Sequence, residues 1–375
     1  MTSEWNHFAL GEITELVIDY RGKTPKKLGG DWCKQGYRAL SAKNIKTGRI
    51  VQAETIRYID ESLYRKWMKD EVQRGDILIT SEAPFGQIFF WDSDEKIVLS
   101  QRLFCVRIKP EYDARFIYYY MTTPEFQSEL DGRATGTTVI GLRQPELMKC
   151  IIRCPEIQEQ KVIAAILSSI DAKIIANEKV NDNLQQQAQA IYSSMFIDNP
   201  DPAWSHGHLS DLITVKYGKD HKKLADGIYP VYGSGGIMRY VERPLYNKES
   251  VLIPRKGTLN NVMYVNQPFW SVDTMFYTEM KLPNVAKFVY HFVKAKDLAS
   301  MNAGSAVPSM TTDILNAMEV VIPSASALEE FESLVAPMYE AMEANDVQSK
   351  ALSQIRDTLL PKLMSGEIDV SAVQL

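Results

Sequence analysis

The sequence predicts an α+β protein in which two mixed α/β domains, related by a pseudo-two-fold repeat, are separated by two long helices that form an antiparallel coiled coil. Three observations predict this fold. A set of motifs occurs twice along the 375 residues, a long helical pattern follows each set, and both patterns place apolar residues at steps of three and four. Solenoid repeats are only roughly 20–50 residues long, so this longer period indicates a duplicated domain.

The two copies keep a nearly constant spacing. Matching positions lie 168 residues apart at the end of each copy, 172 apart further upstream and 199 apart at the start. The first copy is therefore 31 residues longer, the difference between 199 and 168. We divide the chain into a first domain (1–154), a first helix (155–198), a second domain (199–323) and a second helix (324–375). The matching pairs are Gly136 and Gly304, Pro155 and Pro323, Leu184 and Leu352, Ala114 and Ala286, and Leu10 and Leu209.

The two predicted domains contain strands and helices in a similar order. In the first, β-branched or aromatic runs at 76–79, 87–91 and 103–108 predict strands, and residues 115–121 and 124–130 predict helices. In the second, residues 251–253, 261–265 and 275–280 predict strands and residues 286–295 a helix. The Asn-Pro-Asp-Pro run at 199–202 is typical of a linker, because its two prolines cannot continue a helix.

Each predicted long helix carries a heptad seam. The first runs over residues 156–196. Asn177 and Asn345 fall on equivalent seam positions, and a buried Asn in such a seam selects one register at a cost in stability. The seam positions are Ile163, Leu167, Ile170, Ile174, Asn177, Asn181, Leu184, Ala188, Ile191 and Met195, followed in the second helix by Phe331, Val335, Met338, Met342, Asn345, Ser349, Leu352, Arg356, Leu359 and Leu363.

The start of the second helix is also predicted. Ser326 and Glu329 stand at the spacing of a capping box, which would start this helix at that serine. Pro337 lies inside the pattern, so we expect it to kink the helix or to delay its regular start. Helices of an ordinary globular core would also show apolar periodicity, but the length and the two-fold repetition favour a coiled-coil spacer.

Composition narrows the class of protein. The chain has no apolar stretch of about 18 residues and no basic-then-apolar start, so we expect neither a membrane span nor a secretory signal. Its four cysteines have no metal-binding or redox spacing and fit buried thiols in a reducing compartment. We therefore expect a cytoplasmic protein.

The net charge of −5 conceals two basic segments. The segment between residues 20 and 50 contains nine Lys and Arg residues and one acid, and the segment between 216 and 256 contains nine Lys and Arg residues and four acids. The C-terminal helical part is acidic. Basic segments at equivalent places in two repeats indicate contact with a polyanion, although each alone would fit a solvated surface.

Signatures of catalysis are absent from the sequence. The Gly-Lys-Thr at 22–24 lacks the glycine that a P-loop needs five residues earlier, where Val17 stands. His206 and His208 have no neighbouring cluster of metal ligands. We expect no catalytic residue, no metal and no cofactor on this chain.

Several stretches resemble the specificity subunits of type I restriction-modification systems. They are residues 154–163, where a proline, a Glu-Gln pair and an isoleucine enter the first helix, and residues 352–368, which end the second. The stretches 75–86, 136–139, 232–236 and 253–261 resemble strands and turns of that family's recognition domains. Two departures are visible: Gly-Ser-Ala-Val at 304–307 varies the second turn, and the second helix entry lacks the Gln-Lys pair.

The resemblance implies two target recognition domains, each reading one half of a bipartite sequence in double-stranded DNA. It implies that the helices set the gap and bind two modification (methyltransferase) subunits, which supply the cofactor, and that restriction (nuclease/translocase) subunits join where the system also cleaves.

The basic segments then become the candidate DNA interface. Arg and Asn suit contacts to guanine and adenine, and Lys suits phosphate. The phosphate candidates are Lys23, Lys26, Lys27, Lys219, Lys222 and Lys223, and the candidate readers are Arg38, Asn44, Arg255, Lys256 and Asn260. Arg21 and Lys43 are further candidate DNA-binding residues. Two alternatives stay open: a fused or stand-alone DNA-modifying enzyme, and a structural coiled-coil protein with two interaction domains.

Overall fold

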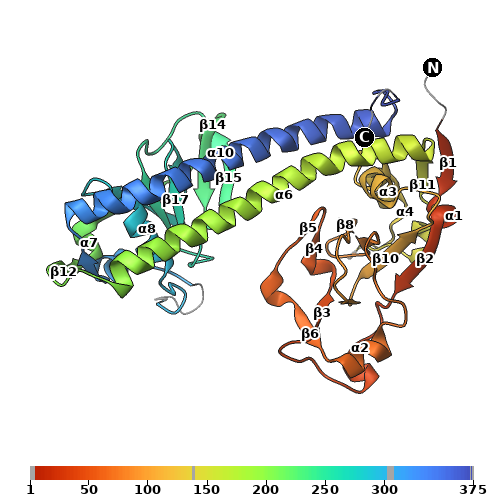
Figure 1. Cartoon of the computed structure of the whole chain (residues 1–375), viewed down its shortest axis with the longest axis horizontal. Helices are drawn as coiled ribbons and strands as arrows, with labels where there is room; N and C mark the ends of the chain where they lie inside the picture. The colour runs from red at the N-terminus through yellow and green to blue at the C-terminus, as the bar shows by residue number, and fades with distance from the viewer. Residues whose placement is uncertain (1–4, 137–139, 302–307, 372, 374–375) are drawn as a thin grey trace. The chain divides into compact units, whose positions relative to one another are not determined.

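The computed structural model describes residues 5–136, 140–301, 308–371 and 373. The chain divides into two compact units, unit 1 with residues 1–175 and 348–375 and unit 2 with residues 176–347. Each unit contains one α/β domain and one segment of each long helix (Figure 1). The repeated turns fall largely at 137–139 and 304–307, outside the described residues. The four-part division at 154, 198 and 323 stays a prediction.

The α/β domain of unit 1 is built around an antiparallel sheet with the strand order β2–β10–β7–β8. A second sheet, β6–β3–β9, pairs β3 with β6 antiparallel and with β9 parallel. The antiparallel pair β1–β11 and the hairpin β4–β5 complete the strands of this domain. The strands are β1 (Asn6–Ala9), β2 (Thr14–Asp19), β3 (Tyr37–Leu40), β4 (Ile45–Lys46), β5 (Arg49–Ile50), β6 (Arg57–Ile59), β7 (Ile77–Thr80), β8 (Ile88–Phe90), β9 (Ile97–Leu99), β10 (Leu103–Ile108) and β11 (Ile151–Cys154).

The four-stranded sheet of unit 1 is buried on both faces. Ile77 and Ile79 of β7 point into a core shared with the long helices, and Leu78 points into a core shared with β3, β6 and β9. Strands buried on both faces read as continuous apolar runs, which is why 76–79 and 103–108 were recognisable. The helices are α1 (Leu10–Ile13), α2 (Glu61–Trp67), α3 (Ala114–Met121), α4 (Pro124–Arg133) and α5 (Gln144–Leu147), with short 3₁₀ turns η1 (Lys26–Leu28), η2 (Ala42–Asn44) and η3 (Ala53–Thr55).

Unit 2 repeats this topology. Its four-stranded sheet has the order β13–β19–β16–β17, its three-stranded sheet the order β15–β14–β18, and β12 pairs with β20. As in unit 1, the middle strand of the three-stranded sheet has one antiparallel and one parallel neighbour. The elements are β12 (Ser205–His208), α7 (Leu209–Leu212), β13 (Ile213–Tyr217), β14 (Asp226–Gly233), β15 (Gly236–Val241), β16 (Ser250–Pro254), β17 (Met263–Val265), β18 (Trp270–Ser271), β19 (Met275–Met280), α8 (Ala286–Lys294), α9 (Thr312–Asn316) and β20 (Glu319–Ile322).

Individual backbone hydrogen bonds confirm the duplication. Leu10 N donates to Cys150 O over 2.8 Å in unit 1, and Leu209 N donates to Met318 O over 2.8 Å in unit 2. The hairpin β4–β5 and the helices α2 and α4 have no counterpart in the described part of unit 2. These insertions account for the greater length of the first copy.

The long helices are α6 (Ile157–Ser193), which continues as the π-helical turn η4 (Ser194–Asp198), and α10 (Ala325–Met364). Within each unit the two helix segments run side by side and antiparallel (Figure 1). In unit 1, Arg356 Nη1 of α10 lies 2.8 Å from Asp171 Oδ1 of α6. Every predicted seam position is buried or half-buried, so the two matched seams are confirmed.

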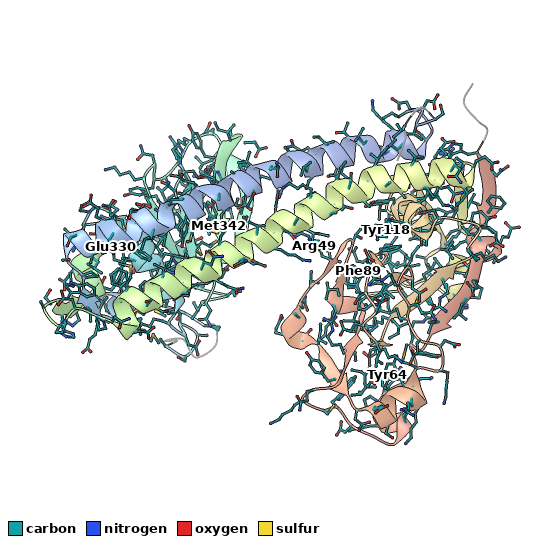
Figure 2. All side chains as sticks on the ribbon, in the orientation of Figure 1. Arg49, Tyr64, Phe89, Tyr118, Glu330 and Met342 are labelled. Atoms are coloured by element: carbon teal, nitrogen blue, oxygen red, sulfur yellow. The ribbon has the colours of Figure 1, made fainter. Side chains whose placement is uncertain are left out.

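The seam of unit 2 contains a cluster of asparagines. Asn177, which is 2% exposed, donates to the carbonyl of Asn345 over 3.4 Å. Asn345 Nδ2 donates to Asn181 Oδ1 over 2.8 Å, and Asn181 Nδ2 donates to Met342 O over 3.2 Å (Figure 2, Met342 labelled). The assigned role of Asn177 and Asn345 in selecting the register stays a prediction, which this bonding supports because a shifted register would leave buried amides unpaired.

The expected cap of α10 is wrong, and so is one of the two effects expected of Pro337. The helix begins at Ala325, and its cap is Ser324, whose Oγ accepts from Ala327 N over 3.2 Å. The capping box at Ser326 is therefore placed two residues too late. Pro337 does not delay the helix, because regular structure begins twelve residues before it and continues through it. A kink at Pro337 stays a prediction.

Each α/β domain is joined to its helix segments by a buried polar link. In unit 1, the Tyr119 hydroxyl of α3 donates to Asp171 Oδ2 over 2.7 Å. In unit 2, the equivalent His291 of α8 contacts Gln189 Oε1 with Nδ1 (2.8 Å) and the Tyr339 hydroxyl with Nε2 (3.0 Å). Because Gln189 Oε1 can only accept, Nδ1 carries the proton and Nε2 accepts from Tyr339.

Among the described residues, no helix is both long and apolar enough to cross a membrane. Cys105, Cys150 and Cys154 are buried free thiols and Cys33 is an exposed one.

We predict that His291 makes the stability of unit 2 depend on pH. Burial lowers the pKa of His291 from its usual 6.5 to about 4. Between pH 7 and pH 5 the His291 side chain becomes protonated in the unfolded chain but stays neutral in the folded one. The free energy of unfolding therefore falls by about 2 kcal/mol as the pH falls. Urea unfolding at both pH values, with hydrogen exchange in α8 as the local probe, measures this loss.

The variant His291→Gln should be less stable at pH 7 and lose that part of the pH dependence. His206→Gln, which alters an exposed histidine, is the control and should keep it. Parallel pH profiles for His291→Gln and the wild type would show that another group is responsible.

Candidate nucleic-acid interface

Three of the candidate lysines in the first basic segment are exposed. Lys26 and Lys27 lie on η1 and Lys43 lies on η2. Lys27 Nζ donates to Gly22 O over 2.8 Å, whereas no hydrogen bond or ion pair to the ammonium of Lys26 or Lys43 occurs in the described part of the chain. Exposed ammonium groups on short turns suit contact with phosphate.

Arg21 and Lys23 are held by the protein itself. Arg21 makes two hydrogen bonds of 2.8 Å to the Asp19 carboxylate, and its guanidinium lies 4.0 Å from the centre of the Phe104 ring. Lys23 Nζ donates to Trp67 O over 2.5 Å. Partial burial lowers the pKa of Lys23. Both cations therefore have structural partners that a phosphate would have to share.

Of the two predicted readers in unit 1, Arg38 is half-buried and forms a two-bond pair with Glu95, with Nε 2.6 Å from Oε1. Asn44 is 1% exposed. Its Oδ1 accepts from Ser41 N (3.1 Å), and its Nδ2 donates to Thr55 Oγ1 (3.0 Å). These bonds use the amide to close the turn η2, so Asn44 is not retained as a base reader.

The second basic segment has a similar division. Lys219, Lys222, Lys223 and Lys256 are exposed. Arg255 is half-buried, with its guanidinium 5.6 Å from the centre of the Tyr217 ring.

Asn260 is exposed, but its amide is engaged within unit 2. Its Nδ2 donates to Asp297 Oδ1 over 3.0 Å and its Oδ1 accepts from Ala299 N over 2.9 Å. Both groups of the amide therefore already have partners before any ligand arrives.

Unit 1 contains a polar cleft that the sequence did not reveal. It has a volume of about 190 Å³ and lies where the ends of β3 and β9 meet η2 and the turn at 82–84. Arg57 packs on one wall, with its guanidinium 3.9 Å from the centre of the Trp32 ring. Polar and cationic side chains line it, among them Ser41, Lys43, Arg57, Gln101 and Arg102.

Only Lys43 and Asn44 of this lining were candidates from the sequence. Trp32, Arg57, Gln101 and Arg102 were missed because they come from separate segments that the fold brings together. One signal was available: Ser-Gln-Arg at 100–102 is a polar break between the apolar runs 97–99 and 103–106. The described residues hold no group of three or more His, Cys, Asp and Glu side chains that could bind a metal ion.

The comparisons with known proteins agree with the resemblance. Residues 2–186 and 203–331 match the family model described as the type I restriction modification DNA specificity domain. The two matches cover the two copies of the repeat and most of the chain.

The chain is similar to named members of that family. It is 25% identical over 341 residues to the type I restriction enzyme MjaIX specificity subunit of Methanocaldococcus jannaschii, covering 79% of this chain and 78% of the relative. It is 20% identical to the HindI specificity subunit of Haemophilus influenzae, covering 80% and 88%. The crystal structure of a type I restriction-modification S subunit from M. genitalium has the same fold, with a TM-score of 0.61, 18% identity and 96% of each chain covered.

The structural role of Asn44 leads to a prediction. Asn44→Ala should lower the free energy of unfolding of unit 1 by about 1–3 kcal/mol, because it removes a buried amide and leaves Ser41 N and Thr55 Oγ1 without their side-chain partner. The adjacent Lys43→Ala, which removes an exposed side chain, should change stability by less than about 0.5 kcal/mol. Denaturant unfolding of both variants measures the difference; equal, small effects would return Asn44 to the candidate readers.

Proposed function

Because the chain belongs to the type I restriction-modification DNA specificity family, we propose that it is the non-catalytic subunit that reads a bipartite DNA target. The α/β domain of each unit reads one half-site, and the helices set the distance between the half-sites. The observation that carries this proposal is the duplication. Both units have the same sheet topology and matching backbone hydrogen bonds, and both carry exposed lysines on their turns.

The partners in the proposal are double-stranded DNA and two modification subunits, which bring the cofactor and transfer the methyl group. Restriction subunits join where the system also cleaves. The long helices offer surface for the modification subunits, because several of their large apolar side chains are exposed. These are Ile175 and Ile355 in unit 1 and Val180, Leu334 and Val347 in unit 2. We expect the complex to work in the cytoplasm, where its DNA lies.

Methylation mapping tests the proposal. When the chain is co-expressed with its modification subunits, methylated sites should share one two-part sequence with a fixed gap. The purified chain with DNA and S-adenosylmethionine should transfer no methyl groups; turnover by the chain alone would favour a DNA-modifying enzyme instead.

We predict that the helices determine the gap. Removing residues 172–178 from α6 and 346–352 from α10 takes one paired heptad from the spacer and retains Asp171 and Arg356. The spacer shortens by about 10 Å, or about three base pairs, while the helix faces rotate by only about 20°. Methylation mapping should therefore find the same half-sites with a shorter gap. An unchanged gap would contradict a measuring role for the helices.

A second prediction distinguishes lysines whose ammonium is exposed from Lys23, whose ammonium is bound to a backbone carbonyl. If about 6–8 phosphates are contacted, affinity for duplex DNA should fall with a log–log salt slope near −5 to −7. Lys26→Ala and Lys43→Ala should each make the slope less steep by about one. Lys23→Ala is the matched comparison; it should change the slope less than either, because the Lys23 ammonium is already bound to Trp67 O. A flat salt response of the wild type would favour the structural coiled-coil alternative.

A further inference from the structure

The polar cleft of unit 1 opens where the chain turns from β9 into β10. Ser100 N donates to Leu40 O over 2.8 Å, at the end of β3. Ser81 N, at the end of β7, donates to Arg102 O over 2.9 Å. These two bonds fix the turn at both sides, so Gln101 and Arg102 are presented from a rigid frame at the ends of two sheets.

Arg102 has an uncommon conformation for a residue with a side chain. Its φ is +66°, in the left-handed region. Its side chain is 47% exposed, and its Nε lies 3.1 Å from Glu82 Oε1. Gln101 beside it is also exposed. Conformations of this kind persist where the surrounding structure holds them, and they cluster at binding sites.

The same junction exists in unit 2. Val272 N donates to Tyr232 O over 3.1 Å and Arg255 N donates to Thr274 O over 2.9 Å. These bonds match those at Ser100 and Ser81, which makes residues 273 and 274 the counterparts of 101 and 102. The isolated bridges Glu82–Gly141 and Lys256–Ser309 are likewise equivalent. Residue 256 is therefore the counterpart of 82.

The two units have the same backbone hydrogen bonds at this junction but different polar side chains. Unit 1 places Glu82, Gln101 and Arg102 there, and unit 2 places Lys256, Asp273 and Thr274. No pair is alike in charge or in hydrogen-bonding groups. This is the pattern expected of one scaffold that recognises two different sequences.

We infer that this junction determines the specificity of each unit: Gln101 and Arg102 read bases of one half-site, and Asp273 and Thr274 read bases of the other. The inference rests on the proposed function. Gln and Arg have the geometry for paired hydrogen bonds to adenine and guanine in the major groove, Asp accepts from cytosine, and Thr contacts either polar groups or the thymine methyl. Glu82, whose carboxylate lies 3.1 Å from Arg102 Nε, is a positioning residue, and Lys43 and Arg57 on the cleft supply phosphate contacts.

The test uses the full chain assembled with its modification subunits and a pool of duplexes randomised at every position. Arg102→Gly removes the side chain and suits the positive φ, and Arg102→Lys keeps the charge without the two-pronged guanidinium. Gln101→Ala and, in unit 2, Asp273→Ala complete the set. Arg65→Ala is the control, because Arg65 is an exposed, ion-paired cation on α2 outside the cleft.

Both Arg102 variants should lose discrimination at one base pair of one half-site by about tenfold or more, with the other half-site unchanged. Asp273→Ala should alter only the other half-site, and Arg65→Ala neither. Arg102→Lys should retain the wild-type affinity for DNA that lacks the target, since its charge remains.

Two results would overturn the inference alone: variants that keep the wild-type target, or a uniform loss in Arg102→Gly that Arg102→Lys restores, which would make Arg102 a phosphate contact. A wild-type complex without any bipartite preference would instead overturn the proposed function and the inference with it.

Discussion

Burial of the helix seam inside each α/β domain is the constraint on which both units depend. Ile163, Leu167 and Leu363 enter the same core as strands β7 and β10 of unit 1. In unit 2, Phe331 and Val335, which follow Ile163 and Leu167 by 168 residues, enter the core of strands β16 and β19. In proteins, most of the stability of an amphipathic helix comes from tertiary burial of its apolar face, and not from helix propensity. Each domain and its helix segments therefore fold as one body.

The polar links at these interfaces are chemically different in the two units. Unit 1 uses Tyr119, Asp171 and the cation of Arg356, whereas unit 2 uses neutral His291 with Tyr339 and Gln189. In unit 2, His291 and Tyr339 are the counterparts of Tyr119 and Asp171 in unit 1. The two units therefore place the link at the same point of the fold but build it from different chemical groups. A buried polar group requires a partner, but any partner of the right length and polarity satisfies it. The turns that face solvent follow the same principle: their frame is shared and their side chains differ.

Much of the fold could be predicted, because the signals were long or repeated. The seam positions hold over both helices, and the core strands read as apolar runs because both faces are buried. Short-range details were less predictable. Ser324 and Ser326 are both plausible helix caps in sequence, and only the backbone path selects Ser324. Asn44 looked like a reader because it stands beside lysines, yet the turn η2 directs its amide inward.

The sequence by itself determined the duplication, the pairing of the two helices and the location of the two basic segments, since periodicity and charge are properties of the chain order. Only the tertiary structure decided which polar side chains meet. Arg57, Gln101 and Arg102 join Lys43 at one cleft because β3 pairs in parallel with β9 on one side and antiparallel with β6, which carries Arg57, on the other. It also decided which cations are engaged, because the partners of Arg21 and Lys23 include backbone carbonyls distant in sequence. Such contacts depend on strand pairing across the domain, and no local pattern encodes them.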